Sequence, residues 1–193
     1  THRFAAVNVT DKSDSLQRLL MREPGKVLVF CNKKIGCEKL GNMLKRSGLP
    51  ADSIHGDKSA EARHMCLGAF SRGKTRFLIA TDVAGRGIDV DDVALVVNYD
   101  FPLALEDYIH RSGRTGRAGK EGRAVSFVAP SEKRLYEVVK AHLQGKEIKD
   151  QPSPPGRGYG MAKGRSGGKR PGGGRPSGGR SGGGGRRATA GAR

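Results

Sequence analysis

The stretch Lys26-Val-Leu-Val-Phe-Cys31 decides the fold class of this sequence, because it is a continuous apolar run of strand length placed directly after Pro24-Gly25. Such a run is typical of a strand that is buried on both faces of a parallel sheet. Two more runs of this kind follow, at Arg76–Thr81 and Val93–Asn98. We therefore predict a parallel sheet as the frame of the fold.

The segments between these runs have helical spacing. Apolar residues recur at positions 35, 40, 43 and 44, and again at 62, 65, 66, 69 and 70, where Ser59 is placed to cap the second helix. Alternating strands and helices predict an α/β fold with helices on both faces of the sheet and functional loops at the carboxyl ends of the strands. The remaining expected elements are strands at Phe4–Val9, Ala51–His55 and Ala124–Val128, and helices near Leu16–Met21, Ala104–Arg111 and Ser131–Leu143.

The charge of the 193-residue chain is concentrated at one end. Lys and Arg number 36 against 19 acidic residues, a net charge of +17. Residues 151–193 hold ten of these basic residues, no acidic residue and 16 of the 30 glycines, which leaves a net charge of +7 for residues 1–150. We predict one folded domain, residues 1–148, and a disordered Gly/Arg/Ser-rich tail, residues 149–193, which has too little apolar surface to fold alone.

Composition excludes several classes of protein. No apolar run approaches the roughly 20 residues of a membrane span, and no signal peptide is recognisable. The three cysteines have no paired or metal-binding spacing, which favours a reducing compartment. We expect an intracellular protein of the nucleus, nucleolus or cytoplasm with a polyanionic partner, nucleic acid above all. The chain begins at Thr1, and we expect it to be the back end of a longer protein.

One phosphate-binding motif is misleading. Gly68-Ala-Phe-Ser-Arg-Gly73-Lys74-Thr75 matches the pattern G-x-x-x-x-G-K-[ST]. That loop binds phosphate only between a preceding strand and a following helix. Here the expected order is reversed, with a helix before the motif and a strand after it. We interpret Gly73-Lys74 as a helix-to-strand turn.

Two other loops carry better candidates for phosphate contacts. Thr81-Asp-Val-Ala-Gly-Arg-Gly-Ile-Asp89 follows an expected strand and combines a hydroxyl, small residues, one arginine and carboxylates. His110-Arg-Ser-Gly-Arg-Thr-Gly-Arg117 places an arginine at every third position, and guanidinium groups suit a phosphate chain. The alternatives are a tight turn with solvated charges for the first loop and a solvated basic patch or import signal for the second.

Taken together, these loops resemble the second RecA-like domain of DEAD-box RNA helicases, and the resemblance covers roughly residues 1–145. The motif in 108–117 is highly specific for that family. The matching segments are Val27–Lys33 with motif IV, His55–Arg63 with the following RNA-binding segment, Ala80–Asp89 with motif V and Tyr108–Arg117 with motif VI.

The resemblance implies a nucleotide site. Arg114 and Arg117 would be arginine fingers that reach the γ-phosphate of ATP. Asp89 would hydrogen-bond the ribose, and Gly87 would allow that approach. His110 would help close the interface with a first RecA-like domain of the same protein. That first domain, which this sequence lacks, would bind Mg and most of the nucleotide, so we expect no ATP hydrolysis by this chain alone.

The resemblance also implies an RNA site. Thr81 and Arg63 would bind RNA phosphates beside the turn at Gly56 and Asp57, which would give little sequence preference. The family usually has a glutamine where this chain has Ala60, so one RNA-side group is missing. A second departure is Gly85, where alanine or serine is common, and we expect that change to loosen the loop slightly.

Two functions of different classes follow. The leading hypothesis is the C-terminal half of an ATP-dependent RNA helicase, without a membrane role. The alternative is a non-enzymatic RNA-binding or chaperone module that acts mainly through its basic tail, whose Arg and Lys would bind phosphates with strong salt dependence. The same tail composition also suits a solubilising or nuclear-import segment. A remoter option is another nucleic-acid translocase with the same fold.

Overall fold

The structure is a computed structural model that describes residues 1–85, 90, 92–116 and 121–146. The predicted tail lies outside these residues. Short 3-10 turns at Val9–Asp11 and Pro130–Glu132 precede the helices α1 and α6. The elements are β1 His2–Ala6, α1 Lys12–Arg22, β2 Lys26–Cys31, α2 Lys34–Arg46, β3 Ala51–Ile54, α3 Ala60–Ser71, β4 Phe77–Thr81, α4 Asp82–Gly85, β5 Val93–Asn98, α5 Leu105–Ser112, β6 Ala124–Val128 and α6 Lys133–Leu143.

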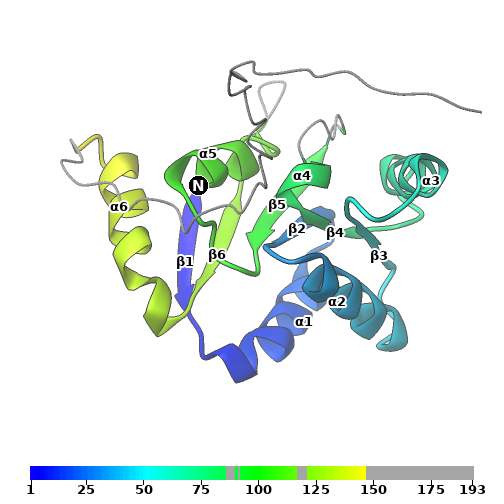
Figure 1. Cartoon of the computed structure of the whole chain (residues 1–193), viewed down its shortest axis with the longest axis horizontal. Coiled ribbons are helices and arrows are strands. Elements are labelled where there is room, and N and C mark those ends of the chain that lie inside the picture. Colours follow the sequence, from blue (N-terminus) through cyan, green and yellow to red (C-terminus); the bar gives the residue numbers. More distant parts are fainter. Residues whose placement is uncertain (86–89, 91, 117–120, 147–193) are drawn as a thin grey trace, which may run out of the picture. The chain divides into compact units, whose positions relative to one another are not determined.

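The strands form a six-stranded sheet in the order β1-β6-β5-β2-β4-β3 (Figure 1). Every strand pair is parallel. The predicted α/β fold is therefore confirmed, and the run at 26–31 forms β2, one of the central strands. Because all strands run the same way, the segments that follow them emerge at one edge of the sheet, which we call the carboxyl edge.

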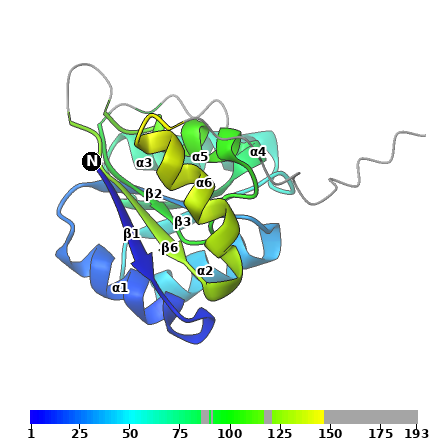
Figure 2. The same ribbon diagram turned by 90° about the vertical axis from the view of Figure 1, so that its left-hand side faces the viewer.

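Helices cover both faces of the sheet (Figures 1 and 2). Val27, Val29 and Cys31 of β2 belong to the core under α1 and α2. Leu28 and Phe30 point the opposite way, into the core under α3 and α4, as the two-residue alternation of a strand requires. A third apolar cluster joins α5 and α6 to β1 and β6. The near-continuous apolar runs are thus explained by burial on both faces.

The first strand differs from its prediction. We expected it at Phe4–Val9, but β1 spans His2–Ala6. Its register is set by β6, which it follows from His2 opposite Ala124 to Ala6 opposite Val128, where β6 ends. Pairing with a distant strand, which local apolar content does not reveal, therefore determines where β1 stops.

The misleading phosphate motif is a helix-to-strand turn, as predicted. Gly68 lies inside α3, and Gly73 has a φ of +74°, which favours glycine. The Gly73 N–H donates to the Phe70 carbonyl oxygen at 3.1 Å, and the strand β4 begins at Phe77. No helix follows the motif to direct its N-terminus at a phosphate.

No helix among the described residues is long and apolar enough to span a bilayer.

Packing requires a glycine at position 85. This corrects the expectation that the glycine would only loosen the loop slightly. It is buried at the end of α4, and a Cβ atom added there would lie 2.5 Å from Cε1 of Phe30. Phe30 is itself 2% exposed and has little room to move. An alanine or serine at this position would therefore require Phe30 to shift.

We predict that Gly85→Ala destabilises the chain by about 1–3 kcal/mol, the usual cost of overpacking a core. Urea unfolding of the chain measures this change. Gly36→Ala in α2 is the matched control, because a Cβ there meets nothing within 4 Å, and it should leave stability equal or higher. Equal midpoints for Gly85→Ala and the parent chain would contradict the packing argument.

Candidate functional site

The carboxyl edge of the sheet brings the predicted site loops together. Cys31 lies opposite Thr81, Ile54 opposite Ala80 and Phe30 opposite Asn98 in the strand registers. The segments that follow β2, β3, β4 and β5 therefore leave the sheet side by side. Ligand sites of open α/β sheets form at this edge.

The centre of the edge is the guanidinium group of Arg111, whose five N–H donors all have acceptors. Nε and Nη2 donate to the two carboxylate oxygens of Asp82 at 2.6 and 2.8 Å. Nη2 also donates to Oδ1 of Asn32 at 2.6 Å. Nη1 donates to Oδ1 of Asn98 at 3.3 Å and to the carbonyl oxygen of Asp100 at 2.8 Å. One side chain of α5 thereby connects the ends of β2, β4 and β5.

The sequence pattern grouped Arg111 with Arg114 and Arg117 as candidates for phosphate contact. For Arg111 this interpretation is wrong. Its side chain is 1% exposed, and its guanidinium carbon lies 5.2 Å from the centre of the Phe30 ring. A guanidinium with no donor left cannot bind a ligand phosphate. A signal was present in the sequence, because Arg111 follows the buried Leu105 and Tyr108 at intervals of three residues on one face of α5.

Arg114 is placed by the end of α5. The N–H of Gly113 donates to the Ile109 carbonyl oxygen at 2.9 Å. The N–H of Arg114 donates to the Arg111 carbonyl oxygen at 3.1 Å. Arg114 then lines a shallow depression together with His110, Asp82, Gly85 and Phe30. Two of the predicted nucleotide residues, Arg114 and His110, thus share one surface.

Three predicted nucleotide residues, Gly87, Asp89 and Arg117, lie outside the described residues.

The predicted RNA residues occupy a second part of the edge. Gly56 and Asp57 are exposed on the turn between β3 and α3, and Nζ of Lys34 lies 2.5 Å from Oδ1 of Asp57. The hydroxyl of Ser59 accepts a hydrogen bond from the N–H of Ala62 at 3.1 Å, which confirms the predicted helix cap. Arg63 follows on the exposed side of α3. The turn and the start of α3 therefore present these groups to solvent together.

Thr81 lies beside this turn, since the register that pairs Ile54 with Ala80 makes His55 and Thr81 the next neighbours. Its side chain is buried, and its hydroxyl has no hydrogen-bond partner among the described residues. Such a buried hydroxyl is costly unless a ligand or water completes it. Thr81 is thus a buried hydrogen-bonding group at the carboxyl edge that the described residues leave unsatisfied.

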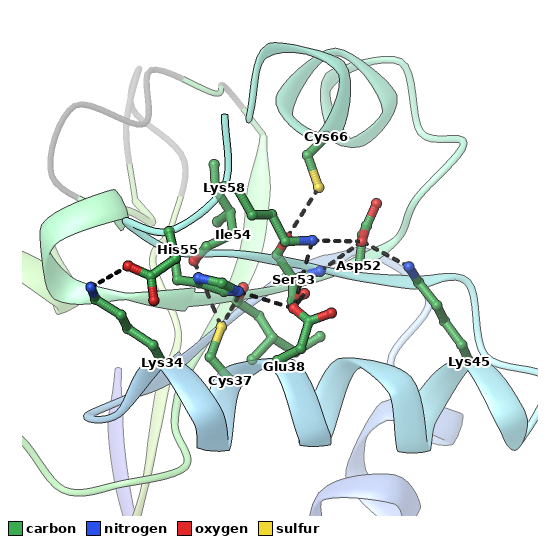
Figure 3. Close-up of polar contacts among 12 residues, drawn as sticks. Lys34, Cys37, Glu38, Lys45, Asp52, Ser53, Ile54, His55, Lys58 and Cys66 are labelled. Carbon is green, nitrogen blue, oxygen red and sulfur yellow. Dashed lines mark hydrogen bonds and ion pairs between the residues drawn. The ribbon is translucent and has the colours of Figure 1, made fainter. Parts of the chain in front are cut away.

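A cluster that the sequence did not reveal holds the same turn (Figure 3). Oε2 of Glu38, on α2, accepts hydrogen bonds from the Ser53 hydroxyl at 2.5 Å and from Nε2 of His55 at 3.0 Å. Nζ of Lys58 lies 3.7 Å from the same oxygen. The hydrogen bond from Ser53 holds the pKa of the Glu38 carboxyl below its usual range, aided by His55 and Lys58, while partial burial opposes the shift.

The other reactive groups carry no site of their own. Cys31, Cys37 and Cys66 are all buried and unpaired. Burial raises the pKa of the Cys37 and Cys66 thiols to about 12, so they are protonated and poor nucleophiles. Within the described part of the chain, no group of three or more His, Cys, Asp or Glu side chains could hold a metal ion.

Comparison with known proteins agrees with this arrangement. The family described as "Helicase conserved C-terminal domain" matches residues 11–119. The ATP-dependent RNA helicase DbpA of Bacillus subtilis is 42% identical over 154 residues, which cover 79% of this chain and 32% of that protein. The chain thus spans about a third of the length of this curated relative.

Solved structures show the same fold. A DEAD box protein from the hyperthermophile Methanococcus jannaschii has a TM-score of 0.69 and 40% identity, over 76% of this chain and 40% of that chain. Dbp5 of S. cerevisiae, solved with RNA and ADP BeF3, has a TM-score of 0.69 and 33% identity, over 76% and 40% of the two chains. The resemblance to DEAD-box proteins and the RecA-like α/β fold are confirmed.

We predict that Arg111→Met destabilises the chain by about 3–5 kcal/mol, because it leaves the Asp82 carboxylate without its partner. Adding Asp82→Asn to that variant should recover part of the loss, since the two residues act as one unit. Urea unfolding measures both effects. Arg22→Met, at an exposed arginine of α1, is the control and should change stability by no more than about 0.5 kcal/mol. Strictly additive losses at Arg111 and Asp82 would contradict the central role of this contact.

Proposed function

We propose, from the premise that this chain belongs to the helicase conserved C-terminal domain family and to its DEAD-box branch, that it is the second RecA-like half of an ATP-dependent RNA helicase. The main support for the proposal is that the carboxyl edge of the sheet presents two adjoining surfaces. One presents Arg114 and His110, and the other presents the turn at Gly56 with Arg63. Arg111 and its partners lie between the ends of the strands that carry both surfaces.

The Arg114 surface would serve ATP. A guanidinium beside an exposed histidine suits the negative charge that develops on a γ-phosphate during transfer. Arg117 would be the second finger, Asp89 would hydrogen-bond the ribose, and Gly87 would permit its approach. His110 would contact a first RecA-like domain. That domain would supply the Mg and the other nucleotide contacts, so we expect this chain to need it for hydrolysis.

The second surface would serve RNA. The exposed guanidinium of Arg63, the turn at Gly56 and Asp57, and the unpartnered hydroxyl of Thr81 suit a sugar–phosphate backbone. Dbp5, a structural relative, has been solved with RNA and ADP BeF3. Closure of two domains over ATP would bend the bound strand so that a short duplex separates, and hydrolysis would reopen them.

A second candidate function rests on the tail. Its ten basic residues without an acidic one favour non-specific RNA binding by residues 151–193. In that case the chain would be an RNA-binding or chaperone module, and nucleotide would not alter its affinity. Either function suits an intracellular protein of the nucleus, nucleolus or cytoplasm.

We predict that Arg117→Ala in the complete enzyme reduces RNA-stimulated ATP turnover by about 10³-fold or more, the usual loss for an arginine finger, while RNA affinity stays near its parent value. Steady-state hydrolysis at saturating RNA and a direct RNA-binding assay measure the two properties. Arg134→Ala, at an exposed position of α6, is the control and should change neither. Unchanged turnover in Arg117→Ala would rule out the arginine finger.

We also predict that Arg63→Ala weakens RNA binding by about tenfold and lowers the dependence of log affinity on log salt by roughly 0.7, the contribution of one phosphate contact on a single strand. The measurement is a salt titration of RNA affinity in the complete enzyme. Arg72→Ala, at the other end of α3, is the matched control and should keep the parent slope. Parent affinity and slope in Arg63→Ala would exclude this surface as the RNA site.

A further inference from the structure

We propose that Glu38 is a positioning residue for RNA binding. Its carboxylate holds the turn at 55–58, and so directs Gly56, Asp57 and Arg63 toward the bound RNA. The inference rests on the proposed function, because it assumes that these groups contact RNA. Glu38 itself lies on α2, outside that surface, and is proposed to act through the turn alone.

The turn needs support from outside the sheet. It follows β3, which is the last strand of the sheet and, among the described residues, is bonded to β4 alone. β3 is also short, with four residues, and the turn after it is exposed at Gly56 and Asp57. An edge strand is paired on one side only, so the segment after it has no neighbouring strand on its outer side. The position of the turn therefore depends on side-chain contacts with α2.

Glu38 makes those contacts on both sides of Gly56 and Asp57 (Figure 3). The same oxygen, Oε2, meets Ser53 of β3 at 2.5 Å, His55 at the start of the turn at 3.0 Å and Lys58 at its end at 3.7 Å. The N–H of Lys58 in turn donates to the His55 carbonyl oxygen at 3.2 Å, which closes the turn. One carboxylate thus determines where the turn begins and where it ends.

His55 makes the contact hard to replace. The residue is 8% exposed, and its Nδ1 is buried without a hydrogen-bond partner among the described residues. Without Glu38, Nε2 would lose its hydrogen bond to Oε2 as well, and both ring nitrogens would be buried and unsatisfied. Because such groups cost free energy, the ring would move toward water and carry the turn with it.

The charges around the turn support the same role. Lys58 lies between Glu38 and Asp52, whose Oδ1 is 3.9 Å from its ammonium group. Lys34 makes a further exposed contact with Asp57, in the middle of the turn. Removing the Glu38 carboxylate would leave Lys58 with the longer contact alone. The cation would then be free to turn toward the phosphates and to pull the end of the turn out of place.

A second contact between α2 and β3 serves as a control for the role of Glu38. Lys45 and Asp52 join the same two elements, α2 and β3, at 2.8 Å, but near the start of the strand, and Asp52 meets the turn through the 3.9 Å contact with Lys58. If Glu38 only held α2 on β3, losing the Lys45 contact would have the same consequence. If Glu38 positions the turn, only its loss would affect RNA binding.

The experiment uses the complete enzyme and the RNA dependence of ATP hydrolysis. We expect Glu38→Ala to raise the KM for RNA by about tenfold, the effect of losing one charge-assisted hydrogen bond, with kcat unchanged at saturating RNA. Glu38→Gln keeps an acceptor for Ser53 and His55, and should raise that KM less than threefold. Lys45→Met should leave both constants unchanged. His55→Phe removes the contact from the other side, and should reproduce the rise in KM even if Glu38→Ala fails to fold.

The double variant Glu38→Ala/Arg63→Ala separates this inference from the proposed function. If Glu38 acts by placing Arg63, the RNA affinity of the double variant should lie within about threefold of that of Arg63→Ala.

Three outcomes would contradict the account. An unchanged KM in both Glu38→Ala and His55→Phe, with a raised KM in Arg63→Ala, would overturn the positioning role and keep the RNA surface. A parent KM in Arg63→Ala would overturn the RNA surface itself. A rise in KM for Lys45→Met equal to that for Glu38→Ala would show a structural contact only, and would also overturn the inference.

Discussion

The guanidinium of Arg111 is the constraint on which the carboxyl edge depends. It is buried and charged, and such a group is tolerated only when its donors are satisfied. All five N–H groups have acceptors, two of them on Asp82 and the others on Asn32, Asn98 and the Asp100 carbonyl. Because these acceptors lie at or just after the ends of three different strands, the strand ends and the helix α5 cannot shift independently of one another.

The two proposed surfaces are built on the same principle. In each, a helix reaches over the carboxyl edge and holds a loop with one charged side chain. Arg111 of α5 holds the segment that begins α4 and lies three residues before Arg114. Glu38 of α2 holds the turn that leads to Arg63. In this account most groups that would touch ATP and RNA lie at the surface, with Arg114 half-buried and Thr81 buried, and polar partners behind them determine their place.

The sequence contained the fold and part of the site. Runs such as Lys26–Cys31 were sufficient for a parallel sheet, since burial on both faces leaves no polar alternation. Arg111 was misinterpreted because an arginine among glycines suggests solvent or phosphate, and its acceptors lie 11 to 79 residues away. Glu38 was missed for a similar reason, because its contacts exist only once α2 packs over β3. The roles of Gly87, Asp89 and Arg117 stay predictions.

The most direct test of the account is an NMR titration of the isotopically labelled 193-residue chain with a short single-stranded RNA. The account predicts that the backbone amide signals of Gly56, Asp57, Arg63 and Thr81 shift as RNA is added, while those of β1 and α6 do not. Shifts confined to residues 151–193 would contradict it, and would make the basic tail the RNA-binding part of this chain.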